Sequence, residues 1–221
     1  DVHWCTTRYH RCIFVDNTFE AGVYTTDSST HLYTDCLIAG NEPFEQLWQN
    51  NFSAQVYDNC VIIGTGGERD LLRLQDGMVT FRNCTLMNGR GVVAINDKSS
   101  GSLILENCLV LNMKDYIVKL DGVPSIRLFL TGNLYGNSPG LLIGGQLFNR
   151  DNWKTFRKDN PKDWSEWLAD GVAANEKGTA VKLKNRYKRD SQVGAALPDS
   201  VWGNYDRIKR VRATPSGVFF D

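Results

Sequence analysis

The sequence has no excess of charge, no long apolar run and few histidines, and each absence excludes a class of function. Its 25 Lys and Arg residues balance 25 Asp and Glu residues, so no overall field steers the chain toward nucleic acid or an anionic membrane. No stretch approaches the roughly 20 consecutive apolar residues that a membrane-spanning helix needs. The three histidines, His3, His10 and His31, are too scattered to predict a metal site or a catalytic triad. We therefore expect no nucleic-acid partner and no membrane span.

The six cysteines include no Cys-x2-Cys pair, which argues against a zinc site. Five of them recur at an interval of 24 residues: Cys12, Cys36, Cys60, Cys84 and Cys108. Such a period is typical of a solenoid, in which every coil places the same residue at the same position. In-register strands lie about 4.8 Å apart, whereas a disulfide needs Cβ atoms about 3.8 Å apart. We therefore expect free, buried thiols, with no metal and no cofactor.

Other columns of residues follow the same frame. Three positions before each cysteine lie Tyr9, Tyr33, Tyr57, Phe81 and Leu105, continued by Phe129. Two positions after it lie Phe14, Ile38, Ile62, Leu86 and Val110, and the frame runs on to Leu134 with Gly132 in the cysteine column. Eleven positions after it lie Val23, Leu47, Leu71, Ile95, Lys119 and Ile143. The apolar runs are short and bounded by turn residues, which predicts several strands per unit and no helices.

The position before each cysteine carries Arg11, Asp35, Asn59, Asn83 and Asn107, with Thr131 next in the frame. Asparagine tolerates left-handed backbone angles, and stacked amides can hydrogen-bond from one coil to the next. With this asparagine ladder, and units such as Gly-Ser-Leu-Ile-Leu-Glu-Asn-Cys at 101–108, the chain resembles the right-handed parallel β-helices of the pectate-lyase-like superfamily. It also looks like the β-helix repeats of large multidomain bacterial proteins.

This resemblance covers about residues 1–148. It implies an all-β fold, a right-handed parallel β-helix with 24-residue coils, and an extracytoplasmic or secreted location. Because the chain begins inside a repeat, we expect it to belong to a longer protein. The resemblance says little about activity, since the fold carries lyases, hydrolases, esterases, adhesins and scaffolds alike.

Residues 149–221 are expected to form a small helical C-terminal cap and a tail that packs on the β-helix. A helix-like spacing runs through Trp153, Phe156, Trp164, Trp167 and Leu168. Pro161 is expected in the first turn of a second helix and Gly171 at its end. A cap of this kind covers strand edges that are otherwise open to association. A strand over Ala180–Tyr187 and a basic tail over Arg207–Arg212 complete the prediction.

The strand that begins at each cysteine is apolar on both faces, as in Cys-Val-Ile-Ile at 60–63 and Cys-Leu-Val-Leu at 108–111. Parallel strands of this composition are normally covered on both sides. Two coverings are open at this point. One is the chain's own segment 180–221, and the other is a protein partner.

The column two positions before each cysteine contains candidate chemistry: Thr34, Asp58, Arg82, Glu106 and Leu130. Asp58 and Glu106 are expected two coils apart with Arg82 between them, which suits a cation or a uronate. The same arrangement suits a surface salt-bridge ladder worth about 0–1 kcal/mol per pair, and we favour the ladder. The column four positions before the cysteine is largely apolar, which suits burial or sugar stacking: Leu32, Val56, Thr80, Ile104 and Leu128.

Two functions follow from these residues and the resemblance. We expect a non-catalytic structural or binding module of a larger bacterial assembly, with a protein partner or a glycan as its ligand. The alternative is a carbohydrate-active enzyme, a polysaccharide lyase or hydrolase that acts on an acidic glycan through Asp58, Arg82 and Glu106.

Overall fold

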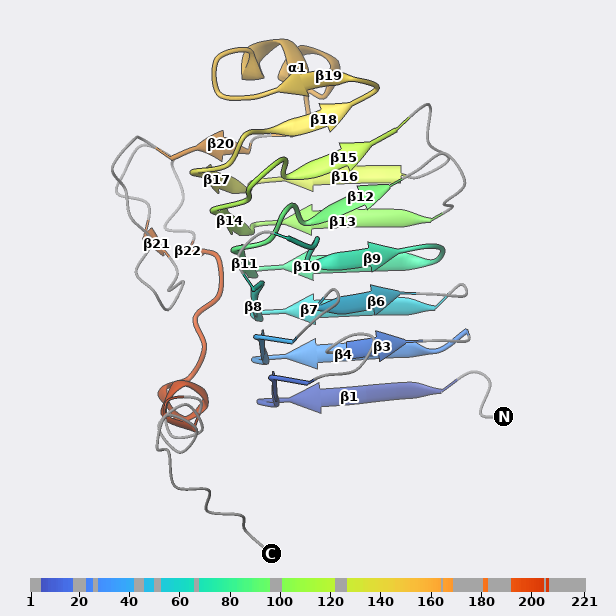
Figure 1. Ribbon diagram of the computed structural model, residues 1–221, viewed down its shortest axis with the longest axis vertical. Coiled ribbons are helices and arrows are strands. Elements are labelled where there is room, and N and C mark those ends of the chain that lie inside the picture. The colour runs from blue at the N-terminus through green and yellow to red at the C-terminus, as the bar shows by residue number, and fades with distance from the viewer. Residues whose placement is uncertain are drawn as a thin grey trace, which may run out of the picture.

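Each coil of the chain contains three short strands, and the strands of successive coils pair to form three sheets around one core (Figure 1). The computed structural model describes residues 5–17, 23–25, 28–41, 46–49, 53–65, 68–95, 101–121, 127–163, 165–168, 181–182, 192–204 and 206. A parallel solenoid with coils of about 24 residues, as expected from the sequence, is confirmed.

The three sheets are named A, B and C in the order in which the chain enters them. Sheet A has six parallel strands: β1 (Thr6–His10), β4 (Thr30–Thr34), β7 (Ala54–Asp58), β10 (Met78–Arg82), β13 (Ser102–Glu106) and β16 (Arg127–Thr131). Sheet B has seven: β2 (Ile13–Val15), β5 (Leu37–Ala39), β8 (Val61–Ile63), β11 (Thr85–Met87), β14 (Leu109–Leu111), β17 (Leu134–Gly136) and β20 (Glu166–Trp167). Sheet C also has seven: β3 (Val23–Thr25), β6 (Leu47–Gln49), β9 (Leu72–Leu74), β12 (Val93–Ile95), β15 (Val118–Leu120), β18 (Leu141–Ile143) and β19 (Gln146–Phe148).

The corner between sheets A and B is formed by the residue before each cysteine. Asp35, Asn59, Asn83 and Asn107 have positive φ angles of 51–57°, the left-handed conformation that asparagine tolerates. The Asn107 side-chain amide donates to Asn83 Oδ1 (2.7 Å), and that of Asn59 donates to Asp35 Oδ1 (2.6 Å). The asparagine ladder is therefore present, although Asn83 donates to Asp58 Oδ1 (3.0 Å) instead of Asn59.

A second ladder, which the sequence analysis missed, lies at the corner after sheet B. The Asn112 amide donates to Asn88 Oδ1 (3.2 Å), and the Asn137 amide donates to Asn112 Oδ1 (2.9 Å). All three residues have positive φ. The interval of 24 residues between Asn88 and Asn112 is the signal that could have revealed this ladder.

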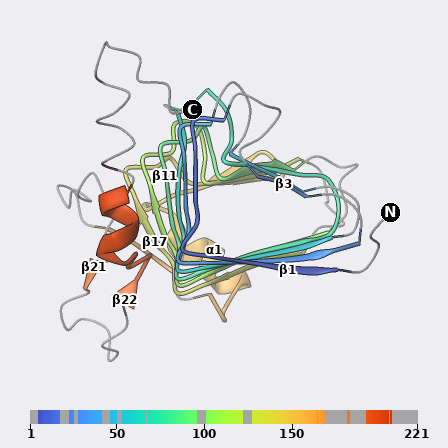
Figure 2. The ribbon, with the colours of Figure 1, turned by 90° about the horizontal axis from the view of Figure 1, so that it is seen from below.

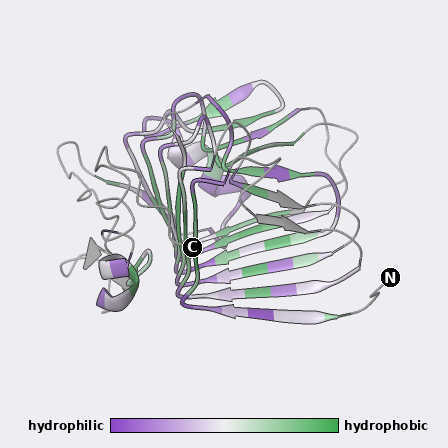
Figure 3. Cartoon of the chain, turned by 60° about the horizontal axis from the view of Figure 1, so that its bottom comes forward, coloured by the Kyte–Doolittle hydropathy of each residue, from purple (hydrophilic) through white to green (hydrophobic). Residues whose placement is uncertain are grey.

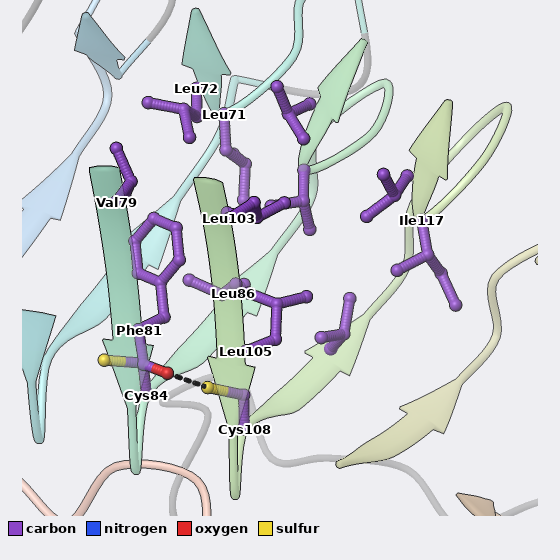
Figure 4. Close-up of a cluster of buried hydrophobic side chains, with 14 of the residues drawn as sticks. Leu71, Leu72, Val79, Phe81, Cys84, Leu86, Leu103, Leu105, Cys108 and Ile117 are labelled. Atoms are coloured by element: carbon purple, nitrogen blue, oxygen red, sulfur yellow. Dashed lines mark hydrogen bonds between the residues drawn. The ribbon is translucent and has the colours of Figure 1, made fainter. Parts of the chain in front are cut away.

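Each buried cysteine side chain lies inside the first corner, close to two carbonyl oxygens. Cys84 Sγ lies 3.3 Å from the Tyr57 carbonyl of the preceding coil and 3.2 Å from the Arg82 carbonyl of its own coil. Cys108 repeats this contact with the Phe81 carbonyl at 3.4 Å (Figure 4). The thiol donor thus faces backbone acceptors at the point where the chain turns inward, and all six cysteines are free.

Next to the thiols, four aromatic rings stack along the solenoid axis. The ring centroids of Tyr9 and Tyr33 are 4.7 Å apart, those of Tyr33 and Tyr57 are 4.6 Å apart, and those of Tyr57 and Phe81 are 5.1 Å apart. Stacked aromatic pairs add about 0.5–1.5 kcal/mol each beyond the burial of their area. Hydrophobic and hydrophilic segments lie next to one another along the strands of the solenoid (Figure 3).

The column prediction is wrong from β16 onward, because one extra residue precedes this strand. Leu105 pairs with Leu130, not Phe129, and Glu106 pairs with Thr131, not Leu130. A shift of one residue moves each side chain of a strand to the opposite face. Phe129 consequently points out of the core with 52% of its surface exposed.

The same shift changes the two corner positions that follow β16. Gly132 occupies the left-handed ladder position, with φ of 65°. The buried Asn133 takes the place of the cysteine, and its side-chain oxygen accepts the Cys108 amide at 2.8 Å. Leu134 pairs with Leu109, so the frame that placed it beside Val110 is wrong.

In sheet C, the column predicted eleven positions after each cysteine is correct only for its first two members, Val23 and Leu47. Leu47 pairs with Leu72, not Leu71, and Val93 pairs with Val118. Lys119 is not an inward residue, because its amine forms an ion pair with Asp121 (3.0 Å). The connections between sheets B and C differ in length from coil to coil, so counting from the cysteine loses the register there.

A hairpin and one short helix close the end of the solenoid beyond β18. The turn at Gly144 and Gly145 reverses the chain into β19, which is antiparallel to β18. Helix α1 (Trp153–Asp159) then crosses the end of the core and buries Trp153 and Phe156 (Figure 1). The small helical cap expected near the C-terminus is thus present.

The second helix predicted from Pro161 is wrong within the described residues. Residues 161–162 form a turn, and β20 then pairs in parallel with β17 as a further strand of sheet B. Trp167 lies opposite Tyr135, with ring centroids 5.4 Å apart, so it extends the stack of the core. Apolar residues at 164, 167 and 168 suit a strand as well as a helix. Trp164 and Gly171 lie outside the described residues.

Burial of the ladder thiols predicts their chemical reactivity. Cys36, Cys60, Cys84 and Cys108 are buried, whereas Cys5 and Cys12 are only partly buried. Burial also raises the pKa of the Cys84 thiol well above its ordinary value, which disfavours the reactive thiolate. We expect an aromatic disulfide reagent to titrate Cys5 and Cys12 in the native protein and the other four only after denaturation. Rapid native labelling of Cys84, or a disulfide-linked peptide joining two ladder cysteines, would contradict this packing.

Candidate functional site

The three residues proposed from the sequence as candidate chemistry lie on neighbouring strands of sheet A. Asp58, Arg82 and Glu106 end β7, β10 and β13 and are paired in register, all outward. Arg82 Nε donates to Glu106 Oε2 at 3.0 Å, with 49% and 45% of the two side chains exposed. Asp58 accepts the Asn83 side-chain amide. The structure therefore brings the three residues together in one outward column, in which Arg82 and Glu106 form a salt bridge.

This arrangement of Asp58, Arg82 and Glu106 offers little to a lyase mechanism. The hydrogen bond to Glu106 raises the pKa of Arg82, which disfavours the neutral guanidine that would abstract a proton. The part of the chain that the structure describes contains no group of three His, Cys, Asp or Glu side chains able to hold a metal ion. Because the Arg82–Glu106 pair is exposed, its contribution to stability is small and screened by salt.

Beside these charged residues, the middle column of the outer face of sheet A is largely apolar. The register of the strands aligns Leu32, Val56, Thr80, Ile104 and Phe129. Leu32, Val56 and Ile104 are partly exposed, and Phe129 is the most exposed large apolar side chain of the column. Phe129 replaces the predicted Leu128 here because of the extra residue before β16. We call residues 32, 56, 80 and 104 the outer stripe.

The outer wall of sheet B is covered by the chain's own residues 192–204, which we call the strap. Ala195, Leu197, Val201 and Trp202 pack against Leu37, Ala39 and Val61 of this wall. Val193 packs against Met87, Leu109, Leu111 and Leu134. The strap runs along the solenoid axis beside sheet B, and its helical residues 199–204 lie outside this sheet (Figures 1 and 2). The doubly apolar strands thus have apolar contacts on both faces.

Hydrogen bonds fix the strap to the coils. The Ala196 amide donates to Asn59 Oδ1 (2.6 Å), and Asn59 Nδ2 donates back to the Ala196 carbonyl (3.1 Å). The Ala195 amide donates to Thr85 Oγ1 (3.0 Å), and the Gly194 amide donates to the Asn107 carbonyl (3.1 Å). The Asn59 side-chain amide still donates to Asp35 in the asparagine ladder, but its oxygen accepts from the strap, and Asn83 donates to Asp58 instead.

A buried carboxylate that sequence reasoning missed lies at the corner between sheets B and C. Asp70 accepts two hydrogen bonds from Arg90, both of 3.1 Å, and one of 2.9 Å from the Tyr116 hydroxyl. Burial, and then the Asp70 charge, raise the pKa of Tyr116. The three residues come from irregular connections, so the repeat contains no signal for them. Because Asp70 accepts hydrogen bonds from both Arg90 and Tyr116, the cluster ties three coils together.

A second buried polar cluster joins the cap to the last coil. The Ser165 hydroxyl and amide both donate to Asp163 Oδ1, at 2.6 Å and 2.9 Å, and the Ser165 oxygen accepts the Asn133 amide at 3.0 Å. The Trp153 indole donates to the Ser165 carbonyl at 2.8 Å. Burial raises the pKa of Asp163 and outweighs the opposing effect of the two Ser165 hydrogen bonds. These bonds hold β20 and α1 over the core.

Where the structure describes them, the remaining candidates from the sequence are not brought together at one site. His10 lies 3.7 Å from Asp35 at the corner before sheet B. His31 faces Tyr9, with ring centroids 6.2 Å apart, and burial lowers its pKa. His3, the basic tail Arg207–Arg212 and most of the strand predicted over Ala180–Tyr187 lie outside the described residues. Of that strand the structure shows β21 (Val181–Lys182), paired with β22 (Gln192–Val193).

Comparison with known proteins adds no relative. No protein-family model, no curated protein and no solved structure matches the chain. Among the described residues no helix is long and apolar enough to cross a membrane.

The substitution Gly194→Ala tests whether the strap packs against sheet B at this position. A Cβ atom at this position would lie 2.8 Å from Leu109 Cβ and 3.0 Å from Thr85 Oγ1, and its φ is 88°. We expect Gly194→Ala to cost about 1–3 kcal/mol of strap docking through steric overlap and backbone strain. Chemical denaturation should show the lost stability, and binding of a hydrophobic dye should report the uncovered wall.

Gly203 supplies the matched control, because a Cβ there meets no atom within 4 Å and the residue is helical. Gly203→Ala should leave stability unchanged or raise it by up to about 1 kcal/mol. Equal effects of the two substitutions would show that the strap is not seated on Leu109 as described.

The buried carboxyl of Asp163 predicts a pH dependence. Its raised pKa means that the folded protein binds a proton more readily than the unfolded chain. The free energy of unfolding therefore gains a contribution as pH falls through the folded pKa toward the unfolded value, and loses it as pH rises. We expect the stability of wild type relative to Asp163→Asn to increase from pH 7 to pH 4, as measured by urea unfolding at each pH. A difference that stays constant, or that changes in the opposite direction, would refute the assignment.

Proposed function

We propose that the chain is a non-catalytic binding and structural module of a larger assembly, and that a protein partner binds the outer face of sheet A. The observation that carries this proposal is the contrast between two apolar surfaces. The wall of sheet B is covered by the strap, whereas the outer stripe of sheet A remains partly exposed. Contiguous apolar surface with a polar rim is typical of interaction sites.

Charge favours a protein over an acidic glycan as the partner. Beside the stripe, Arg82 is already paired with Glu106, and Asp58 adds a further negative charge. A uronate polymer needs cations that are not already neutralised, and it is repelled by carboxylates. A mixed rim around an apolar centre is the usual pattern of a protein interface. Membership of the pectate-lyase-like superfamily and an extracytoplasmic location stay predictions.

The enzyme alternative is tested directly by turnover. Purified protein incubated with a panel of uronate polymers should release no unsaturated products and no new reducing ends, because Arg82 is held protonated by Glu106. Cleavage that is lost in Arg82→Ala and retained in Lys114→Ala, an exposed cation away from sheet A, would overturn the non-catalytic proposal.

The binding surface is tested by charge substitutions in the outer stripe. We expect Ile104→Glu to change the unfolding free energy by no more than about 1 kcal/mol, since the side chain points outward. It should weaken binding of the purified partner about 10-fold or more, as titration calorimetry would measure. Lys114→Glu is the control and should bind normally. Partner binding that is unaffected by both Ile104→Glu and Val56→Glu would place the interface elsewhere.

A further inference from the structure

A cleft of about 620 Å³ lies between β16 and the cap. Most of its wall is apolar, and three aromatic rings line it: Phe129 of β16, Phe148 of β19 and Phe156 of α1. The rings of Phe148 and Phe156 contact each other with centroids 5.2 Å apart, and Phe129 is 52% exposed. The volume falls within the range of about 300–1,000 Å³ that is typical of small-molecule sites.

A buried carboxyl group also lines this apolar cleft. Asp163 is only 3% exposed, whereas Asp159 and Lys162, which line the same cleft, are exposed at its rim. The Oδ1 atom of Asp163 accepts both hydrogen bonds from Ser165, at 2.6 Å and 2.9 Å. The Oδ2 atom is buried and has no hydrogen-bond partner among the described residues. Of the two carboxyl oxygens, Oδ2 is therefore the one available to a molecule in the cleft.

The charge of Asp163 determines which molecules suit this cleft. None of the ion pairs among the described residues includes Asp163, and Arg157 acts on it only through attraction at longer range. A buried carboxylate without a cation is costly, and a positively charged donor that reaches its free oxygen offsets this cost. An ammonium group is such a donor, whereas an anion is repelled by Asp163 and Asp159.

We propose that the cleft binds a small molecule that carries a protonated amine on an apolar, aromatic body. The ammonium group donates to Asp163 Oδ2, and the body packs against Phe129 and Phe148. The faces of aromatic rings also attract a nearby cation, which favours an amine over a neutral molecule of the same shape. The residues of the outer stripe do not line the cleft, so the inference does not depend on the proposed protein partner.

Titration calorimetry of the full chain with 2-phenylethylamine at pH 7 tests the proposal. This alkylamine is protonated at that pH, as a lysine side chain is. It should bind wild type about 10-fold or more tightly than 2-phenylethanol, which has the same ring and chain but no charge. The anionic analogue 3-phenylpropionate should bind more weakly than the alcohol. Equal binding of the amine and the alcohol, or no binding of the amine, would overturn the proposal.

Two carboxamide substitutions test which carboxylate holds the ammonium group. Asp163→Asn keeps an oxygen that can accept from Ser165 but removes the charge, so the amine should lose its advantage over the alcohol. Asp159→Asn is the matched control, because it removes an exposed carboxylate whose charge is screened by water, and it should keep the preference for the amine. A loss in Asp159→Asn as large as that in Asp163→Asn would place the ammonium group at the rim and contradict the proposal.

A substitution in the apolar wall keeps the test valid if Asp163→Asn does not fold. Thermal unfolding of each variant without ligand checks its fold. Phe129→Ala removes a side chain that is 52% exposed, so it should fold as wild type does. This variant should bind the amine and the alcohol more weakly than wild type, and by similar factors, because both lose the same apolar contact. Amine binding as tight in Phe129→Ala as in wild type would place the amine outside this cleft and overturn the proposal.

Discussion

Stacking of coil upon coil in register is the constraint on which the rest of the structure depends. Every coil must turn at the same place, and the corner between sheets A and B shows how it does so. A residue with left-handed backbone angles reverses the chain, its side chain bonds to the coil below, and the thiol that follows faces two carbonyl groups. The ladder residue is small and polar, and the cysteine that follows it is small and apolar, so the corner is compact. The aromatic stack lies directly beside this corner.

One extra residue ahead of β16 has consequences that extend over the whole capped end. It turns Phe129 outward, places Asn133 at the cysteine position and thereby starts a hydrogen-bonded cluster with Ser165 and Asp163. That cluster holds β20 on sheet B and α1 over the core. Among the described residues, sheet A receives no strand after β16.

The sequence predicts the elements that repeat and fails where the repeat is interrupted. The cysteine, aromatic and asparagine columns can be predicted because in-register stacking favours one residue type at each position. In sheets A and B the 24-residue interval holds as far as Glu106. Lys119 was misplaced because connection lengths vary before sheet C. The Asp70 cluster and β20 depend on contacts between irregular segments, which no local pattern records. The sequence predicts that Asp58, Arg82 and Glu106 lie on neighbouring strands of one column. It does not predict that Arg82 forms its ion pair with Glu106 and not with Asp58.

The strap links the fold to the proposed function. It covers the apolar outer wall of sheet B, whereas the outer stripe of sheet A stays partly exposed. Hydrogen exchange at the strap amides tests this account most directly. The amides of Ala195 and Ala196 donate to Thr85 and Asn59, so they should exchange as slowly as amides of sheet B itself. Exchange at the rate of an unstructured peptide would show that the wall of sheet B is open, and would contradict the assignment of sheet A as the binding face.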